Sequence, residues 1–328
     1  MTVERPGEDS LIARFFAPLA GEGALDLKDD AARLNPKPGH DLVLTADALV
    51  ESVHFLPDDA PGSIARKALG VNISDLAAKG ADPVGFLLSL ALPGDWTEVW
   101  LAEFSAGLGE AARDFGCPLL GGDTVKAKGA LTLSVTAIGE VPEGRMVRRT
   151  TAQEGDLICV TGTIGDAALG LRLRSSPAWV GTLSEEERAF LADRYLHPRP
   201  RHRLARAVRT YARASMDVSD GLAGDLAKMM RVSGVSAVVD VDQVPLSDSA
   251  GKAVRASPAL MDIVLTGGDD YEILCTVSEN NLDSFRKEAD SVGIPLSVIG
   301  CVVSGDERPL FRGQGSERRY DVGSYSHF

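Results

Sequence analysis

Basic residues are in short supply in this chain. It contains 34 Lys and Arg residues but 47 Asp and Glu residues, which gives a formal net charge of -13 over 328 residues. A nucleic-acid-binding protein needs a basic surface to hold the phosphate backbone, so we exclude nucleic acid as a partner. Anionic ligands can still bind an acidic protein when metal ions lie between the two.

Cysteine and long apolar runs are also scarce. The four cysteines stand singly and no Cys-x-x-Cys pair occurs, which favours reduced, buried thiols over a disulfide framework. The apolar stretch 84–93 is far too short to span a bilayer. Charged residues interrupt the N-terminal segment where the apolar core of a secretory signal would lie. We therefore expect a cytoplasmic protein with no membrane partner.

The common nucleotide-binding motifs are missing as well. The sequence contains no Gly-x-x-x-x-Gly-Lys-[Ser/Thr] and no Gly-x-Gly-x-x-Gly followed by a Rossmann-type acidic residue. It also lacks the His-Arg-Asp and Asp-Phe-Gly motifs of protein kinases. If the chain binds ATP, it does so with another fold.

What the chain does contain is the composition of a globular α+β protein with two domains. Hydrophobic residues make up 44% and charged residues 25%, and the length suits about two domains. We place the domain boundary in the Pro-, Gly- and Arg-containing segment 142–155 and expect domains at 1–145 and 146–328. The apolar run 84–92 predicts a strand buried on both faces. Strands are expected at 41–47, 84–92, 117–120, 130–141, 156–162, 236–242, 271–277 and 296–303, and helices at 63–79, 95–115, 184–197 and 279–292. The first three helices are expected to start at Ser63, at Asp95 and at a capping box of Ser184 and Glu187, and the first to stop at Gly80.

Aspartates recur along both halves, several of them directly after apolar strands. They are Asp29, Asp30, Asp47, Asp75, Asp123, Asp217, Asp220, Asp269 and Asp270. Carboxylates that gather in one place repel one another unless a cation offsets their charge, and Mg²⁺ prefers such oxygen ligands. For a single aspartate, a local role at a turn or cap is the stronger interpretation. Asp75 fits that interpretation least, because it lies in an apolar helical stretch with Asn72 on the same face.

Glycine, arginine and histidine supply weaker signals. Gly-Gly-Asp occurs at 121–123 and again at 267–269, each after a Ser-Asp pair at a similar separation, which fits a repeat or chance equally. Paired glycines let backbone N–H groups approach a phosphate, but they also make ordinary turns. The arginines at 145–149 suit either phosphate binding or a solvated linker. His54, alone between apolar residues, favours a structural role.

Taken in order, these segments resemble the thiamine-monophosphate kinase family along nearly the whole chain. The matching segments are 7–12 (Gly-Glu-Asp-Ser-Leu-Ile), 29–32, 45–47, 53–55, 71–81 (Val-Asn-Ile-Ser-Asp-Leu-Ala-Ala-Lys-Gly-Ala), 121–124, 160–166, 217–222 (Asp-Val-Ser-Asp-Gly-Leu), 267–272 (Gly-Gly-Asp-Asp-Tyr-Glu) and 325–328. The resemblance implies the fold of aminoimidazole ribonucleotide synthetase, with an N-terminal α/β domain whose sheet forms a homodimer and a C-terminal α+β domain. It implies transfer of the ATP γ-phosphoryl group to thiamine phosphate, with several Mg²⁺ ions.

The same resemblance assigns roles to individual residues. The implied metal ligands are Asp30, Thr45, Ala46 (through its backbone carbonyl), Asp47, Asp75, Asp123, Asp217 and Asp220, and five of these carry the catalysis: Asp30, Asp47, Asp75, Asp123 and Asp220. The implied nucleotide contacts are Gly121, Gly122, Arg149, Ser219 and, more weakly, Phe104. The implied thiamine phosphate contacts are His54, Asp269 and Tyr325.

Two rival functions have features that this sequence can be checked for. Selenophosphate synthetase, of the same superfamily, would carry a reactive cysteine near the N-terminus, and no cysteine precedes Cys117. A non-catalytic sensor of thiamine phosphates or nucleotides would not need so many aspartates. Three positions depart from the family pattern: Lys28 and Ala46 replace a usual Gly and Thr, and Asp269 replaces Glu with a side chain one methylene shorter.

Overall fold

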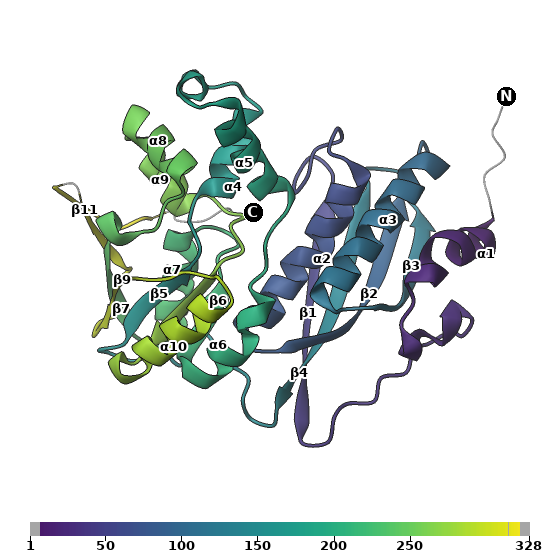
Figure 1. Cartoon of the computed structure of the whole chain (residues 1–328), viewed down its shortest axis with the longest axis horizontal. Helices are drawn as coiled ribbons and strands as arrows, with labels where there is room; N and C mark the ends of the chain where they lie inside the picture. Colours follow the sequence, from purple (N-terminus) through teal and green to yellow (C-terminus); the bar gives the residue numbers. More distant parts are fainter. Residues whose placement is uncertain (1–6, 314, 322–328) are drawn as a thin grey trace. The chain divides into compact units, whose positions relative to one another are not determined.

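The computed structural model describes residues 7–313 and 315–321. The chain forms two compact units (Figure 1), of which the first comprises Met1–Leu76 and Ala81–Gly144. The second comprises Ala77–Gly80 and Arg145–Phe328. Each unit has its own sheet, and we describe the two in turn.

The described part of the first unit contains a mixed, four-stranded sheet in the order β1-β4-β2-β3. Its strands are β1 (His40–Val50), β2 (Asp82–Leu92), β3 (Leu119–Lys126) and β4 (Thr132–Pro142). Strand β4 pairs antiparallel with both β1 and β2, whereas β2 and β3 run parallel, as strands joined through a helix do. The strands predicted at 41–47, 84–92 and 130–141 were placed within three residues at each end, but β3 extends six residues beyond the predicted 117–120.

Helices α2 (Pro61–Ala78) and α3 (Glu98–Phe115) lie over one face of this sheet (Figure 1). Both helices end within one residue of the predicted position. Each end is followed by a glycine with positive φ, Gly80 after α2 and Gly116 after α3. Both predicted N-terminal caps were wrong. Helix α2 starts at Pro61, whose missing N–H costs nothing in a first turn, and Thr97 rather than Asp95 caps α3 by accepting the Trp100 N–H at 3.1 Å.

Within the described residues, the opposite face of the sheet is bare along β1 and faces the N-terminal segment at β2 and β3. Along β2, Phe86, Leu88 and Leu90 are buried while Leu87 and Ser89 are exposed, so the prediction of burial on both faces was wrong for this strand. An apolar run cannot by itself distinguish a strand covered on both sides from one whose second apolar face is bare. Near the β3 edge, the N-terminal segment forms short helical turns: α1 (Glu8–Leu11), η1 (Ile12–Phe16), η2 (Ala17–Leu19) and η3 (Glu22–Leu27).

The second unit is built on a seven-stranded sheet, counted over its described residues, in the order β11-β10-β7-β9-β5-β8-β6. The strands are β5 (Leu157–Thr161), β6 (Ala212–Asp217), β7 (Ser236–Asp240), β8 (Ile273–Val277), β9 (Leu296–Val303), β10 (Leu310–Gly313) and β11 (Ser316–Arg318). Only the β7–β10 pair is parallel among these described strands. The strands predicted at 156–162, 236–242, 271–277 and 296–303 all form.

Two hydrophobic cores lie on the two faces of this sheet. In β8, Leu274 packs into the first core, whereas its neighbours Ile273 and Cys275 pack into the second. This alternation follows from the pleat of a strand, and it explains why the central strands have no polar face.

The cysteines of both units are free thiols. Burial raises the pKa of Cys117 and of Cys159 to about 12, so these thiols stay protonated. Four free cysteines are found, and Cys301, partly exposed, departs from the predicted burial.

The helices of the second unit are α4 (Asp166–Leu173), η4 (Ala178–Thr182), α5 (Glu185–Leu196), η5 (His202–Leu204), α6 (Ala205–Tyr211), α7 (Leu222–Ser233), η6 (Val241–Gln243), α8 (Asp248–Ala256), α9 (Leu260–Thr266) and α10 (Glu279–Ser291). Two of these helices were predicted from the sequence, α5 at the expected 184–197 and α10 at the expected 279–292, whereas the others were not. The predicted capping box is present, with Ser184 and Glu187 each accepting from the other's backbone N–H at the start of α5.

Candidate active site

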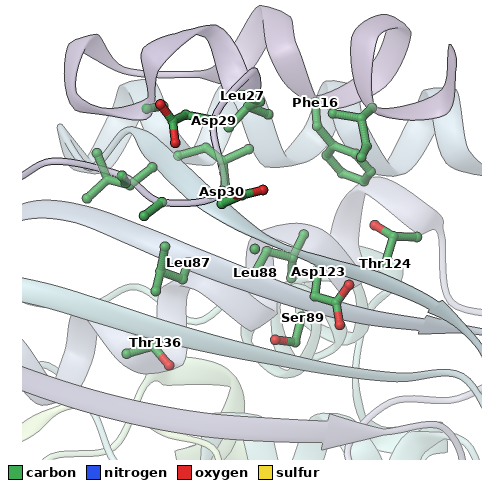
Figure 2. A pocket seen from close by; sticks show the side chains of 18 of the residues that line it. Phe16, Leu27, Asp29, Asp30, Leu87, Leu88, Ser89, Asp123, Thr124 and Thr136 are labelled. Atoms are coloured by element: carbon green, nitrogen blue, oxygen red, sulfur yellow. The ribbon is translucent and has the colours of Figure 1, made fainter. Parts of the chain in front are cut away.

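A pocket of about 770 Å³ opens in the first unit between its N-terminal segment and the sheet (Figure 2). Its apolar wall includes Phe16, Leu27 and Leu87. Its polar lining includes the carboxylates of Asp29, Asp30 and Asp123 together with Ser89, Thr124 and Thr136. The pocket therefore combines an apolar wall with an acidic side, which suits a ligand that carries a ring and metal-bound anionic groups.

The first Gly-Gly-Asp segment lies inside strand β3, not after it. Asp123 was predicted at a strand end, but it pairs with Ser89 in the middle of the β2–β3 ladder. Asp47 lies equally within β1, opposite Val135, so the strand-end interpretation was wrong for both residues. Gly122 has a packing reason to be glycine, because a Cβ there would lie 1.8 Å from the Leu88 carbonyl oxygen.

A second polar group lies on the helix-covered side of the same sheet. The Thr45 hydroxyl donates to Asp75 Oδ2 at 2.5 Å, and the Asp47 N–H donates to Asn72 Oδ1 at 3.1 Å. Asp75 and Asn72 thus share one face of α2, as the sequence predicted, and both contact β1. Ala46, the next residue along the strand, is exposed on the other face.

The carboxylates of the first unit therefore form two groups. Asp30 and Asp123 line the pocket, while Asp75 holds Thr45 beneath the sheet. Among the described residues, no group of three or more His, Cys, Asp or Glu side chains is arranged to hold a metal ion. The implied metal ligands therefore do not form such a group among the described residues. Sparse carboxylates still suit Mg²⁺, which usually takes one or two of them and completes its shell with water and substrate phosphates.

His54 lies in the turn between β1 and α2. The ring Nδ1 of His54 accepts the Val50 N–H at 3.0 Å, and the backbone N–H of His54 donates to the Val50 carbonyl at 3.0 Å. Because Nδ1 is an acceptor, a neutral ring carries its proton on Nε2. Both contacts are local, so the turn holds the ring in one orientation.

In the second unit, the predicted residues occupy the loop between β6 and α7. Asp217 ends β6 and is buried, while Ser219 and Asp220 follow it and are partly exposed. The backbone N–H groups of Ser219 and Asp220 both donate to Asp225 Oδ2, at 3.0 and 2.9 Å. Asp225, fully buried in the first turn of α7, is therefore what holds this loop.

Lys228 completes that arrangement. Its ammonium lies 2.5 Å from Asp220 Oδ2 and 2.9 Å from Asp225 Oδ1. Burial lowers the pKa of Lys228, but the carboxylates of Asp225 and Asp220 raise it by more, so the side chain stays charged. Sequence analysis missed both Asp225 and Lys228. Their only signal is an i,i+3 acid–base pair at a helix start, which is common on exposed helices.

The second Gly-Gly-Asp segment packs directly against this loop. The Asp269 N–H donates to the Ser219 carbonyl at 2.9 Å, and the Tyr271 N–H donates to the Val218 carbonyl at 2.8 Å. A Cβ at Gly268 would lie 2.3 Å from the Ser219 carbonyl oxygen, so no side chain fits at that position. The structure thus brings Asp269, Ser219 and Asp220 together in one place.

Two predicted residues lie elsewhere, and a third is outside the described residues. Arg149 is exposed in the segment that follows β4, where its carbonyl accepts the Ser233 hydroxyl at 3.1 Å. Phe104 has no exposed surface and stacks on Trp100 with ring centroids 5.1 Å apart, so we do not propose a nucleotide contact for it. Tyr325 lies outside the described residues.

Two family models match this chain, one in each half. The model of the AIR synthase related protein N-terminal domain matches residues 28–141, and that of the C-terminal domain matches residues 153–310. The chain is thus an AIR synthase related protein of two α/β domains. The thiamine-monophosphate kinase of Caulobacter vibrioides is 42% identical over 306 residues, which cover 92% of this chain and 85% of that protein. This chain belongs to the thiamine-monophosphate kinase family.

Solved structures of thiamine-monophosphate kinases are similar to this chain in fold. The thiamine-monophosphate kinase from Stenotrophomonas maltophilia K279a is similar with a TM-score of 0.82 and 38% identity, over 94% of this chain and 96% of that one. A structure described as AaThiL complexed with AMPPCP and TMP is similar with a TM-score of 0.79 and 30% identity, over 100% of both chains. Among the described residues of our chain, no helix is long and apolar enough to cross a membrane.

Proposed function

We propose that this chain transfers the γ-phosphoryl group of ATP to thiamine monophosphate, giving thiamine diphosphate and ADP. The observation that carries the proposal is the match over 100% of both chains to a structure described as complexed with AMPPCP and TMP, which are an ATP analogue and thiamine monophosphate. The acidic pocket of the first unit and the joined loops of the second supply oxygen ligands and small residues of the kind that such substrates need.

The chemistry requires positioning and charge neutralisation more than a nucleophilic side chain. The attacking atom is an oxygen of the acceptor phosphate, which is already anionic near neutral pH, so no strong general base is needed. We propose direct in-line transfer without a phosphorylated enzyme. Gly121, Gly122, Arg149 and Ser219 would contact the nucleotide, and His54, Asp269 and Tyr325 would contact thiamine monophosphate.

Several Mg²⁺ ions are part of the proposal. When bound, they would offset the negative charge of the two phosphorylated substrates. The residues proposed to hold them are Asp30, Thr45, the Ala46 carbonyl, Asp47, Asp75, Asp123, Asp217 and Asp220. The oxygen donors of this set are the type that Mg²⁺ prefers, and their scatter in small groups leaves coordination positions for substrate oxygens.

We further propose a cytoplasmic homodimer. The bare face of the first unit's sheet exposes apolar side chains on two strands that flank β4, among them Leu44 of β1 (64% exposed) and Leu87 of β2 (37%). Large apolar side chains exposed on one face of a sheet are often covered by another protein surface. The four free cysteines agree with a reducing compartment.

A product assay tests the central claim. The protein is mixed with ATP, Mg²⁺ and thiamine monophosphate, and thiamine diphosphate is measured by chromatography after conversion to a fluorescent thiochrome. We expect thiamine diphosphate and ADP in equal amounts. Binding of both substrates without product would instead indicate a sensor, and a phosphorylated side chain on the productive path would rule out direct transfer.

A further inference from the structure

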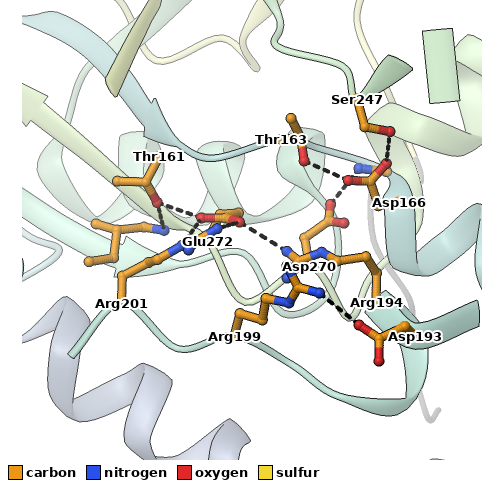
Figure 3. A network of polar contacts seen from close by, with 12 residues as sticks. Thr161, Thr163, Asp166, Asp193, Arg194, Arg199, Arg201, Ser247, Asp270 and Glu272 are labelled. Atoms are coloured by element: carbon orange, nitrogen blue, oxygen red, sulfur yellow. Dashed lines mark hydrogen bonds and ion pairs between the residues drawn. The ribbon is translucent and has the colours of Figure 1, made fainter. Parts of the chain in front are cut away.

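The second unit contains a buried cluster of charged side chains that the proposed reaction does not use directly (Figure 3). At its centre is Glu272, which is 0% exposed and immediately precedes β8. Its carboxylate accepts from Arg194 Nη2 at 3.0 Å and from Arg201 Nε at 2.6 Å, and Arg201 Nη2 adds a further contact. Two guanidinium groups therefore hold one buried carboxylate, which compensates for its loss of water.

Thr161, the last residue of β5, also contacts Glu272. The Thr161 hydroxyl donates to Glu272 Oε2 at 2.7 Å and accepts the Ile273 N–H at 2.8 Å. Gly162 follows with a φ of +58°, and a Cβ there would lie 2.2 Å from Glu272 Oε1. The segment 160–166, which matched the family pattern without receiving a role, is thus shaped around Glu272.

The cluster lies directly beside the segment that presents Asp269. The Glu272 carbonyl accepts the Val218 N–H at 2.8 Å, so Glu272 takes part in the same backbone ladder that joins Tyr271 and Asp269 to residues 218 and 219. Asp269 and Tyr271 have φ values of +72° and +51°, in a region that residues with a Cβ rarely adopt. Such conformations persist only where the surroundings determine them.

We propose that Arg194 and Arg201, acting through Glu272, are positioning residues that hold segment 267–271 in the conformation that binds the acceptor. The side chains themselves do not touch the substrate. This inference rests on the proposed function, in that it takes Asp269 as a contact of thiamine monophosphate. The proposal predicts an effect on the acceptor and little effect on ATP.

The test compares Arg201→Lys and Arg201→Met with Arg199→Met as the matched control. Arg199 lies two residues away and pairs with Asp193 at 2.7 Å on the surface. Lysine keeps the charge but loses the fork that reaches both Glu272 oxygens. We expect Arg201→Lys to raise KM for thiamine monophosphate about tenfold, with KM for ATP and kcat within about twofold. Arg199→Met should leave all three unchanged.

Hydrogen–deuterium exchange without any substrate gives a second measurement. In Arg201→Lys we expect faster exchange of the amides at 269–273, which the cluster holds, while α8 and strand β7 keep their protection. Arg201→Met should show a larger change of the same kind, and if it fails to fold the lysine variant still decides. Unchanged exchange in a folded Arg201→Lys, or equal increases in KM for ATP and the acceptor, would overturn the proposal.

The two proposals fail in different ways. If the wild-type protein makes no thiamine diphosphate, the proposed function fails, but the exchange measurement still decides whether Arg201 positions segment 267–271. If the wild-type protein is active and Arg201→Lys leaves exchange and KM unchanged, only the positioning role is lost.

Discussion

Lys228 Nζ lies 2.5 Å from Asp220 Oδ2, so a positive charge already occupies a carboxylate proposed to bind Mg²⁺. The same ammonium contacts Asp225, whose other oxygen holds the loop backbone of Ser219 and Asp220. Any cation that binds Asp220 must therefore displace Lys228 or share the carboxylate with it.

Replacement of Lys228 by Met should lower the Mg²⁺ concentration needed for half-maximal activity, because Asp220 loses its competing cation. It should also lower the free energy of unfolding by about 1–2 kcal/mol, since buried Asp225 loses a charged donor that is itself one-third exposed. Mg²⁺ titration of initial rates and urea unfolding measure the two effects. Lys228→Arg, which keeps the charge, serves as the control; an unchanged Mg²⁺ requirement in Lys228→Met would contradict the competition.

Replacement of Asp75 by Asn should abolish turnover while the fold survives. Asn keeps an oxygen to accept the Thr45 hydroxyl, but it removes the negative charge proposed to bind Mg²⁺. A loss of several kcal/mol of charge stabilisation corresponds to a fall in kcat of about 100-fold or more. Steady-state kinetics and circular dichroism check this. Asp114→Asn, at an exposed ion pair with Arg66, is the control, and near-normal activity of Asp75→Asn would refute the metal assignment.

Replacement of Leu44 by Glu should weaken the proposed dimer. Leu44 is 64% exposed on the bare face of the sheet, and a carboxylate there would have to be buried without a partner when two such faces meet. Analytical ultracentrifugation should show a shift from dimer to monomer. Val99→Glu, at a residue 68% exposed on α3, is the matched control. A wild-type protein that sediments as a monomer would contradict the dimer itself.

Replacement of Asp270 by Asn should flatten the pH dependence of stability. Burial raises the pKa of Asp270 well above its usual 3.8, so the folded state holds a proton that the unfolded state releases. The wild type therefore loses stability as pH rises from about 4 through the folded-state pKa, by up to about 1.4 kcal/mol per pH unit. Asn has no such proton. Urea unfolding at pH 5 and 8 should show a larger fall for the wild type than for Asp270→Asn; equal falls would contradict the assignment.

The pattern of secondary structure was largely predictable from the sequence. Strand β8 forms within the predicted 271–277 because its apolar run is buried on both faces, and β9 forms at the predicted 296–303 with only part of its length buried. Helix α5 begins where its capping box predicts, since that signal depends on contacts within four residues. The caps of α2 and α3 were misplaced, because Ser63 and Asp95 compete with Pro61 and Thr97 within two residues.

The candidate site was predictable only as a set of residues. Asp75 and Asn72 could be placed on one helix face from their spacing, and the structure confirms that both contact β1. Asp123 and Asp47 were assigned to strand ends, yet each lies within a strand whose length depends on pairing with its neighbour. Asp225 gave no usable signal, because its role comes from burial against the loop at 219–220.

By itself, the sequence determined the main strands and helices of the first unit, several of those of the second, and the acidic, oxygen-rich character of the candidate site. Those properties depend on hydrophobic periodicity and residue chemistry, which are local. Only the tertiary structure decided which face of the first sheet stays bare, which carboxylates meet, and that Glu272 joins segments far apart in the chain. These depend on burial and on contacts between distant segments, which no single stretch of sequence specifies.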